Sequence, residues 1–128
     1  MIVAGLGFRR GVHAEDIEFA LKQAIQALSP RLERLDGVAV PLAKAEEGAL
    51  IAVVKSHRFK LIPISQSELE AAGSGAVTRS AKSLEVMNVP SVAEAAALAG
   101  AGETARLLVP RVVHGGVTCA IAESVSAQ

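Results

Sequence analysis

The sequence predicts a single α/β domain over residues 1–128, with a mostly parallel or mixed sheet and helices packed on it. Short apolar segments typical of strands alternate with segments whose apolar residues recur at helical spacing. A length of 128 residues suits one domain with one core. No internal repeat or linker divides the chain. The order of the strands does not follow from the sequence.

The first two strand and helix pairs are read from apolar patterns. Ile2 to Leu6 form an apolar run closed by glycine, which is typical of a buried strand. Residues 14–28 then carry apolar side chains at helical spacing, and Ser29-Pro30 should end that helix. The Val-Ala-Val run within 37–41 predicts a second strand, and the composition of 42–56 predicts a second helix.

A third strand is predicted at 59–64, where basic and apolar residues alternate. Glu68 follows Ser65 at the spacing of a capping box, so a short helix should begin there. The segment 71–78 is rich in Gly, Ser and Ala and has neither a helical nor a strand period. This composition predicts a mobile surface loop.

The second half of the chain is predicted to hold two further helices and two further strands. Ser91 and Glu94 have the spacing of another capping box, and Gly115-Gly116 separate two β-branched runs. Those runs predict a closing hairpin or a pair of neighbouring strands. The predicted elements are helices over 80–87 and 92–101 and strands over 107–113 and 117–121.

Composition limits the classes of partner. Lys and Arg number 13 and Asp and Glu number 13, so no overall field draws the molecule to nucleic acid or to an anionic membrane. Trp and Tyr are absent, which removes the usual platforms for stacking bases. Apolar runs such as 49–54 are too short to span a membrane, and no secretory signal is evident. We therefore expect a cytoplasmic protein that binds neither nucleic acid nor membrane.

The first candidate site is the turn after the first strand, residues 5–11, which reads Gly-Leu-Gly-Phe-Arg-Arg-Gly. It lies between a strand and a helix, where open α/β sheets bind ligands. A dinucleotide fingerprint would need glycine at position 10 and an acidic residue ending the second strand, where the chain has Arg10 and Pro41. The glycines let the backbone approach a ligand, and Arg9 or Arg10 can pair with a carboxylate or phosphate. The alternative is a tight turn with two solvated arginines.

The second candidate site is the charged segment 44–48, which follows the second strand. Lys44 could bind an anion, and Glu47 could act as a general acid or base. The alternative is an ordinary charged first turn of a helix. Ser80, Glu94 and Thr118 are polar residues beside apolar runs and form a third group of candidates. Within it, Glu94 already has a structural role as the partner of Ser91 in a capping box.

The remaining reactive side chains point to no metal or cofactor. His13, His57 and His114 lack the spacing of a metal site, so we expect no bound metal. Cys119 lies in an apolar strand, where a buried and inert thiol is the usual outcome. The chain contains neither a nucleophile elbow nor a P-loop lysine motif.

Four segments, in order along the chain, resemble the CobE/CbiG C-terminal domain family of cobalamin biosynthesis, most like its free-standing form. They are residues 5–11, residues 44–48, the sequence Val-Pro-Ser-Val-Ala-Glu-Ala-Ala-Ala-Leu at 89–98 and the sequence Val-Thr-Cys-Ala-Ile-Ala at 117–122. The chain departs from the family at Arg111, where lysine is common. The resemblance implies ligand-binding roles for Gly5, Gly7, Arg9, Arg10, Gly11, Lys44, Ser80, Glu94, Arg111 and Thr118. It leaves Lys44, Glu47 and Ser80 as catalytic candidates.

The resemblance implies work on the corrin ring. The first interpretation is a protein that binds a polycarboxylate corrin or precorrin intermediate of the aerobic pathway, with other enzymes of the pathway as candidate partners. The alternative is a hydrolase that opens the lactone ring of a precorrin-5A-type intermediate and releases acetaldehyde. In CbiG-type proteins that activity is implied for a longer enzyme, in which this domain is the C-terminal part.

Overall fold

The computed structural model describes residues 2–28, 35–73, 92–102 and 105–124. Its centre is a five-stranded mixed sheet with the order β3-β2-β1-β5-β4. β2 is parallel to β1 and β3, whereas β5 is antiparallel to β1 and β4. The strands are β1 (Ile2–Gly7), β2 (Gly37–Pro41), β3 (Lys60–Ile64), β4 (Ala105–His114) and β5 (Val117–Ser124). The predicted α/β class is confirmed, and the sheet is of the mixed kind.

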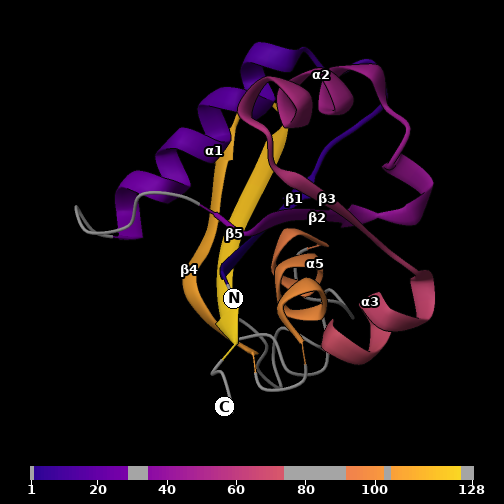
Figure 1. Ribbon diagram of the computed structural model, residues 1–128, viewed down its shortest axis with the longest axis vertical. Coiled ribbons are helices and arrows are strands. Elements are labelled where there is room, and N and C mark those ends of the chain that lie inside the picture. Colours follow the sequence, from indigo (N-terminus) through magenta and orange to yellow (C-terminus); the bar gives the residue numbers. More distant parts are fainter. Residues whose placement is uncertain (1, 29–34, 74–91, 103–104, 125–128) are drawn as a thin grey trace.

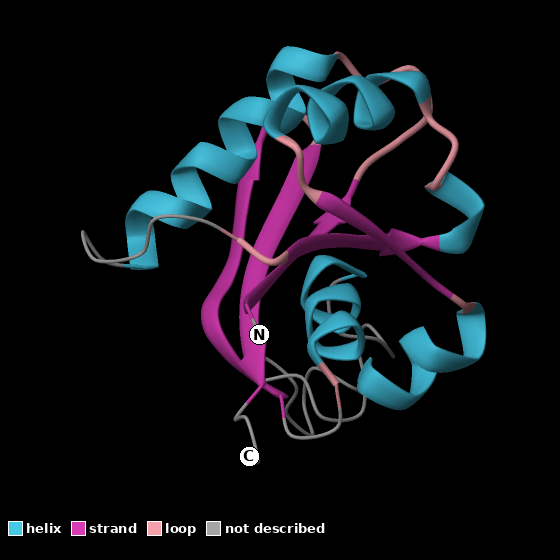
Figure 2. Ribbon diagram, in the orientation of Figure 1, coloured by secondary structure: helices cyan, strands magenta, loops and turns pink. Residues whose placement is uncertain are grey.

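Helices cover both faces of this sheet. They are α1 (Ala14–Leu28), α2 (Gly48–His57), α3 (Gln66–Gly73) and α5 (Val92–Ala101). Figures 1 and 2 show α1 and α2 on one face and α3 and α5 on the other. Side chains therefore alternate between two cores along β1: Ala4 and Leu6 pack in the core that contains α1 and α2, and Val3 packs in the core that contains α5.

The predicted helix over 42–56 is wrong at its start. A 3-10 turn, η1 (Leu42–Lys44), follows β2, and α2 begins only at Gly48. Glu47 precedes α2 with an extended backbone, φ −62° and ψ 127°, which separates the two helical segments. As a result, Lys44 and Glu47 lie in a connection at the edge of the sheet, and only Glu47 adjoins the helix.

The predicted capping box at the start of α3 is confirmed. The Ser65 amide donates to Glu68 Oε1 at 2.9 Å, and the Glu68 amide donates to Ser65 Oγ at 3.2 Å. The loop predicted over 71–78 is wrong for its first three residues, because α3 continues to Gly73 through two alanines that favour helix. The rest of that loop, the helix predicted over 80–87 and Ser91 lie outside the described residues.

The closing hairpin is also confirmed. β4 and β5 pair through a turn at Gly115 and Gly116, whose φ angles of 55° and 83° match the hairpin turn that requires positive φ at both positions. Both strands are longer than predicted. The helix predicted over 92–101 is α5, with the same bounds.

The contact of α5 with β1 is close enough to exclude a side chain at Gly5. A Cβ added there would lie 2.1 Å from the Ala93 carbonyl oxygen and 2.4 Å from the Ala97 amide nitrogen. On the same face, a Cβ at Gly100 would lie 2.9 Å from Ala39 Cβ. The helix can rest on the strands only because these two positions are glycine and most of its own inward residues are alanine.

We predict that Gly5→Ala destabilises the protein strongly. Its Cβ meets helix backbone, which cannot move aside as a flexible side chain can, so the cost should reach or exceed the roughly 1–3 kcal/mol of an overpacked core. Gly48→Ala is the matched control, because nothing lies within 4 Å of its added Cβ. Urea unfolding followed by circular dichroism measures both changes. Equal midpoints for Gly5→Ala and the wild type would contradict this packing.

Candidate functional site

A pocket of about 410 Å³ opens at the carboxyl ends of β1 and β2. It is bounded on one side by the end of β1 and by η1, and on the other by the start of α5 and the β4–β5 hairpin. Its lining residues are Gly7, Phe8, Arg9, Pro41, Ala43, Lys44, Val92, Arg111, Gly116 and Thr118. This is the edge at which open α/β sheets hold their ligands.

Three cationic residues reach this pocket from three separate segments. Arg9 comes from the turn after β1, Lys44 from η1 and Arg111 from β4. Asp and Glu are absent from its lining in the described part of the chain. The whole chain has a formal net charge of +0, so the pocket is a local concentration of positive charge.

The connection between β2 and α2 braces the turn after β1 from two sides. Lys44 Nζ donates to the Phe8 carbonyl oxygen and lies 5.4 Å from the centre of the Phe8 ring, a cation–π distance. The Gly11 amide donates to Glu47 Oε2 at 3.2 Å. Gly11 has a φ of 81°, which residues other than glycine rarely adopt. Lys44 and Glu47 thus hold the shape of the turn that carries Arg9.

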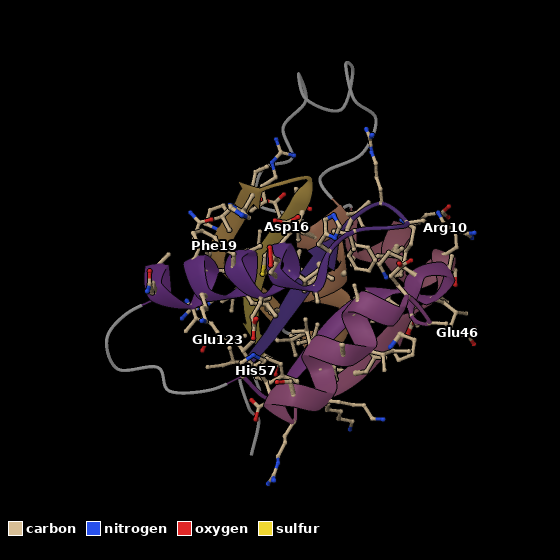
Figure 3. The ribbon with its side chains drawn as sticks, turned by 90° about the horizontal axis from the view of Figure 1, so that it is seen from above. Arg10, Asp16, Phe19, Glu46, His57 and Glu123 are labelled. Atoms are coloured by element: carbon tan, nitrogen blue, oxygen red, sulfur yellow. The ribbon has the colours of Figure 1, made fainter. Side chains whose placement is uncertain are left out.

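The two neighbouring arginines of the turn differ in position. Both side chains are exposed, but Arg9 lines the pocket, whereas Arg10 is absent from the lining and projects outward from the molecule in Figure 3. The sequence offered either residue as an anion ligand. The structure brings Arg9, rather than Arg10, together with Lys44 and Arg111.

The remaining predicted ligand residues divide between the pocket and its support. Thr118 and Gly7 both line the pocket, and Thr118 Oγ1 donates to the Gly7 carbonyl oxygen at 3.4 Å. Gly5 lies beneath α5, where its missing side chain permits the helix contact described above. Ser80 lies outside the described residues.

Glu94 is fully buried, with 0% of its surface exposed, and stands behind the pocket lining. Its Oε2 accepts a hydrogen bond from the Arg111 amide at 3.2 Å. The predicted ligand residues omitted Phe8 and Gly116, which lie in the two predicted turns, and the apolar lining residues Pro41, Ala43 and Val92. The composition of these apolar residues carries no chemical signal, and only their places at the ends of β2 and α5 could have indicated them.

Two histidines are absent from the pocket lining and connect α1 to its neighbours. His57 Nε2 lies 2.6 Å from Glu18 Oε2, and His114 stacks on Phe19 at 4.0 Å between ring centres. Figure 3 shows His57 and Phe19 around α1. Among the described residues, no three His, Cys, Asp or Glu side chains gather as a metal site, and no helix is both long and apolar enough to cross a membrane.

Cys119 lies in β5 with its side chain fully buried in the core beneath α1. Burial raises the pKa of its thiol to about 12, because the interior disfavours the charged thiolate. The nucleophilic form is therefore scarce at neutral pH, and Cys119 belongs to the core rather than to the pocket chemistry.

We predict that Cys119 reacts with a disulfide reagent near neutral pH only when the protein unfolds. Folded protein should label at a rate that rises with urea in step with unfolding, whereas denatured protein should label at once. Because the folded pKa is raised above that of the free thiol, this group should also lower the stability as the pH rises from about 9 towards 12. Fast labelling of the folded protein would contradict the buried placement.

Comparison with known proteins places the chain in a family. The family model described as "Cobalamin synthesis G C-terminus" matches residues 2–122. Protein CobE from Sinorhizobium sp is 31% identical over 121 residues, covering 94% of this chain and 79% of that protein. The crystal structure of cobalamin biosynthesis protein chiG from Agrobacterium tumefaciens str. C58 is 39% identical with a TM-score of 0.78, covering 98% of this chain and 100% of the other. The crystal structure of CobE, a protein from the cobalamin (vitamin B12) biosynthetic pathway, is 27% identical with a TM-score of 0.82, covering 100% and 93%. The chain belongs to the CobE/CbiG C-terminal domain family of cobalamin biosynthesis proteins.

Proposed function

We propose that this cobalamin biosynthesis protein binds a polycarboxylate corrin or precorrin intermediate in the pocket at the carboxyl ends of β1 and β2, and holds or delivers it. The observation that carries this proposal is the meeting of Arg9, Lys44 and Arg111 at one pocket of a chain with a formal net charge of +0. Such a site attracts anions locally without a field over the whole molecule.

The chemistry of the lining suits the two kinds of surface that such a ligand presents. Corrin precursors carry acetate and propionate carboxylates around an apolar macrocycle. Charge-assisted hydrogen bonds from arginine and lysine match the carboxylates, and Pro41, Ala43 and Val92 offer apolar contact. Leu42, 59% exposed next to Ala43, and Val92, 45% exposed, add apolar surface at the edge of the pocket. The volume of about 410 Å³ lies within the range of roughly 300–1,000 Å³ typical of small-molecule pockets.

Lys44 can serve both the turn and a ligand. Its ammonium group has three N–H donors, and the bond to the Phe8 carbonyl oxygen uses one of them. The same bond fixes the position of the ammonium group at the pocket wall. The site is therefore partly organised before a ligand arrives, which reduces the entropy lost on binding.

The hydrolase interpretation draws less support from the geometry. Glu47, its candidate acid or base, already accepts the Gly11 amide, and Ser80 lies outside the described residues. Incubation of the protein with the lactone-bearing precursor, followed by assay for acetaldehyde, separates the two functions. Release by the wild type that is lost in Glu47→Gln would favour the hydrolase over a purely binding protein.

We predict that Arg9→Gln weakens binding of hydrogenobyrinic acid roughly tenfold or more, since a hydrogen bond to a charged group contributes about 1.5–3 kcal/mol. Arg10→Gln is the matched control, because it removes the same charge from the same turn but outside the pocket. Titration followed by the absorbance of the ligand measures both affinities.

The wild-type affinity should also fall with rising salt, because pocket and ligand carry opposite charges. The decisive comparison is between the affinities lost in Arg9→Gln and in Arg10→Gln. Equal losses in the Arg9 and Arg10 variants, or no loss in either, would contradict the proposed site.

A further inference from the structure

β4 departs from regular pairing where it passes the pocket. Val109 pairs with Ile121 and Val112 with Cys119, so three steps along β4 match two steps along β5, and β4 carries one extra residue there. The segment between these pairs is Pro110-Arg111, and both residues are exposed. A bulge of this kind redirects side chains and leaves an amide without its partner in the ladder.

The backbone of the bulge needs a hydrogen-bond acceptor, and Glu94 supplies it. Pro110 has no N–H, so Arg111 carries the first donor after it. That amide donates to Glu94 Oε2 at 3.2 Å across the gap between β4 and α5. A backbone amide left without a hydrogen-bond partner at such a position would destabilise the folded state. The bond to Glu94 removes this cost.

The burial of Glu94 calls for a specific reason. It is the only fully buried charged side chain among the described residues, and it stands in a helix whose other buried residues are alanine and leucine. An apolar residue would pack there without the desolvation cost of a carboxyl group. The position of Glu94 in the first turn of α5 favours a carboxylate through the helix dipole.

We propose that Glu94 is a positioning residue that fixes the β4 bulge and thereby holds Arg111 at the anion-binding pocket. Val92, two residues earlier on α5, lines the same pocket. The first turn of α5 therefore supplies an apolar lining residue and the carboxylate that holds Arg111. Glu94 itself touches no ligand in this arrangement. This inference rests on the proposed function, because Arg111 binds an anion only if the pocket binds a carboxylate ligand.

Glu94→Leu tests the proposal, since leucine fills a similar volume and accepts no hydrogen bond. We expect it to weaken binding of hydrogenobyrinic acid as much as Arg111→Gln does, roughly tenfold. The double variant should bind no more weakly than Arg111→Gln alone, because both changes remove the same contact. Glu94→Gln keeps an acceptor oxygen and should retain most of the affinity. Glu123→Leu is the control, because it removes a half-buried carboxylate of β5 that pairs with Arg106 of β4, the strand of Arg111, outside the pocket lining.

Additive losses in the double variant would overturn the proposal, because Glu94 would then act apart from Arg111. Amide hydrogen exchange gives a second measurement that needs no ligand. The Arg111 amide should be protected in the wild type and in Glu94→Gln and should exchange faster in Glu94→Leu. Fast exchange of this amide in the wild type would overturn the positioning role even if Glu94→Leu failed to fold. Failure of the wild type to bind hydrogenobyrinic acid would overturn the proposed function and leave the exchange result to decide the anchoring of Arg111.

Discussion

The contact of α5 with β1 is the constraint on which the rest of the structure depends. The helix lies where a Cβ on Gly5 would stand, and its run of alanines brings its backbone down to the sheet. This depth sets where the first turn of α5 meets the end of β1, and so where Val92 joins the pocket. It also brings Glu94 within hydrogen-bond distance of β4. A substitution in the middle of the α5–β1 interface should therefore shift the pocket residues that α5 carries.

The site combines local charge with prior organisation. Arg9 stands on a turn that Lys44 and Glu47 brace, and Arg111 stands on a bulge that Glu94 anchors. Lys44 is thus held through its own side chain and Arg111 through its amide, whereas Arg9 is held through its neighbours Phe8 and Gly11. Groups fixed in this way lose little freedom when a ligand binds, which would favour the proposed binding of an anion by a protein without net charge.

The sequence predicts local features well and distant ones poorly. The capping box at Ser65, the glycine hairpin turn and the bounds of α5 follow from local chemistry, and all three are confirmed. The strand order and the β4 bulge depend on pairing between segments far apart in the sequence, so no local pattern shows them. The family resemblance named Arg9, Lys44, Arg111 and Thr118, which the pocket brings together. It also named Gly5 and Glu94. Their structural roles, the close contact of α5 with β1 and the bond to the Arg111 amide, depend on how α5 packs on β1 and β4.

An amide NMR titration of the isotope-labelled protein with hydrogenobyrinic acid tests the location of the binding site most directly. The largest saturable shifts should fall on the amides of Gly7, Gly116 and Thr118, which line the pocket. Shifts confined to the opposite end of the sheet, around Ile2, Arg106 and Glu123, would contradict this location.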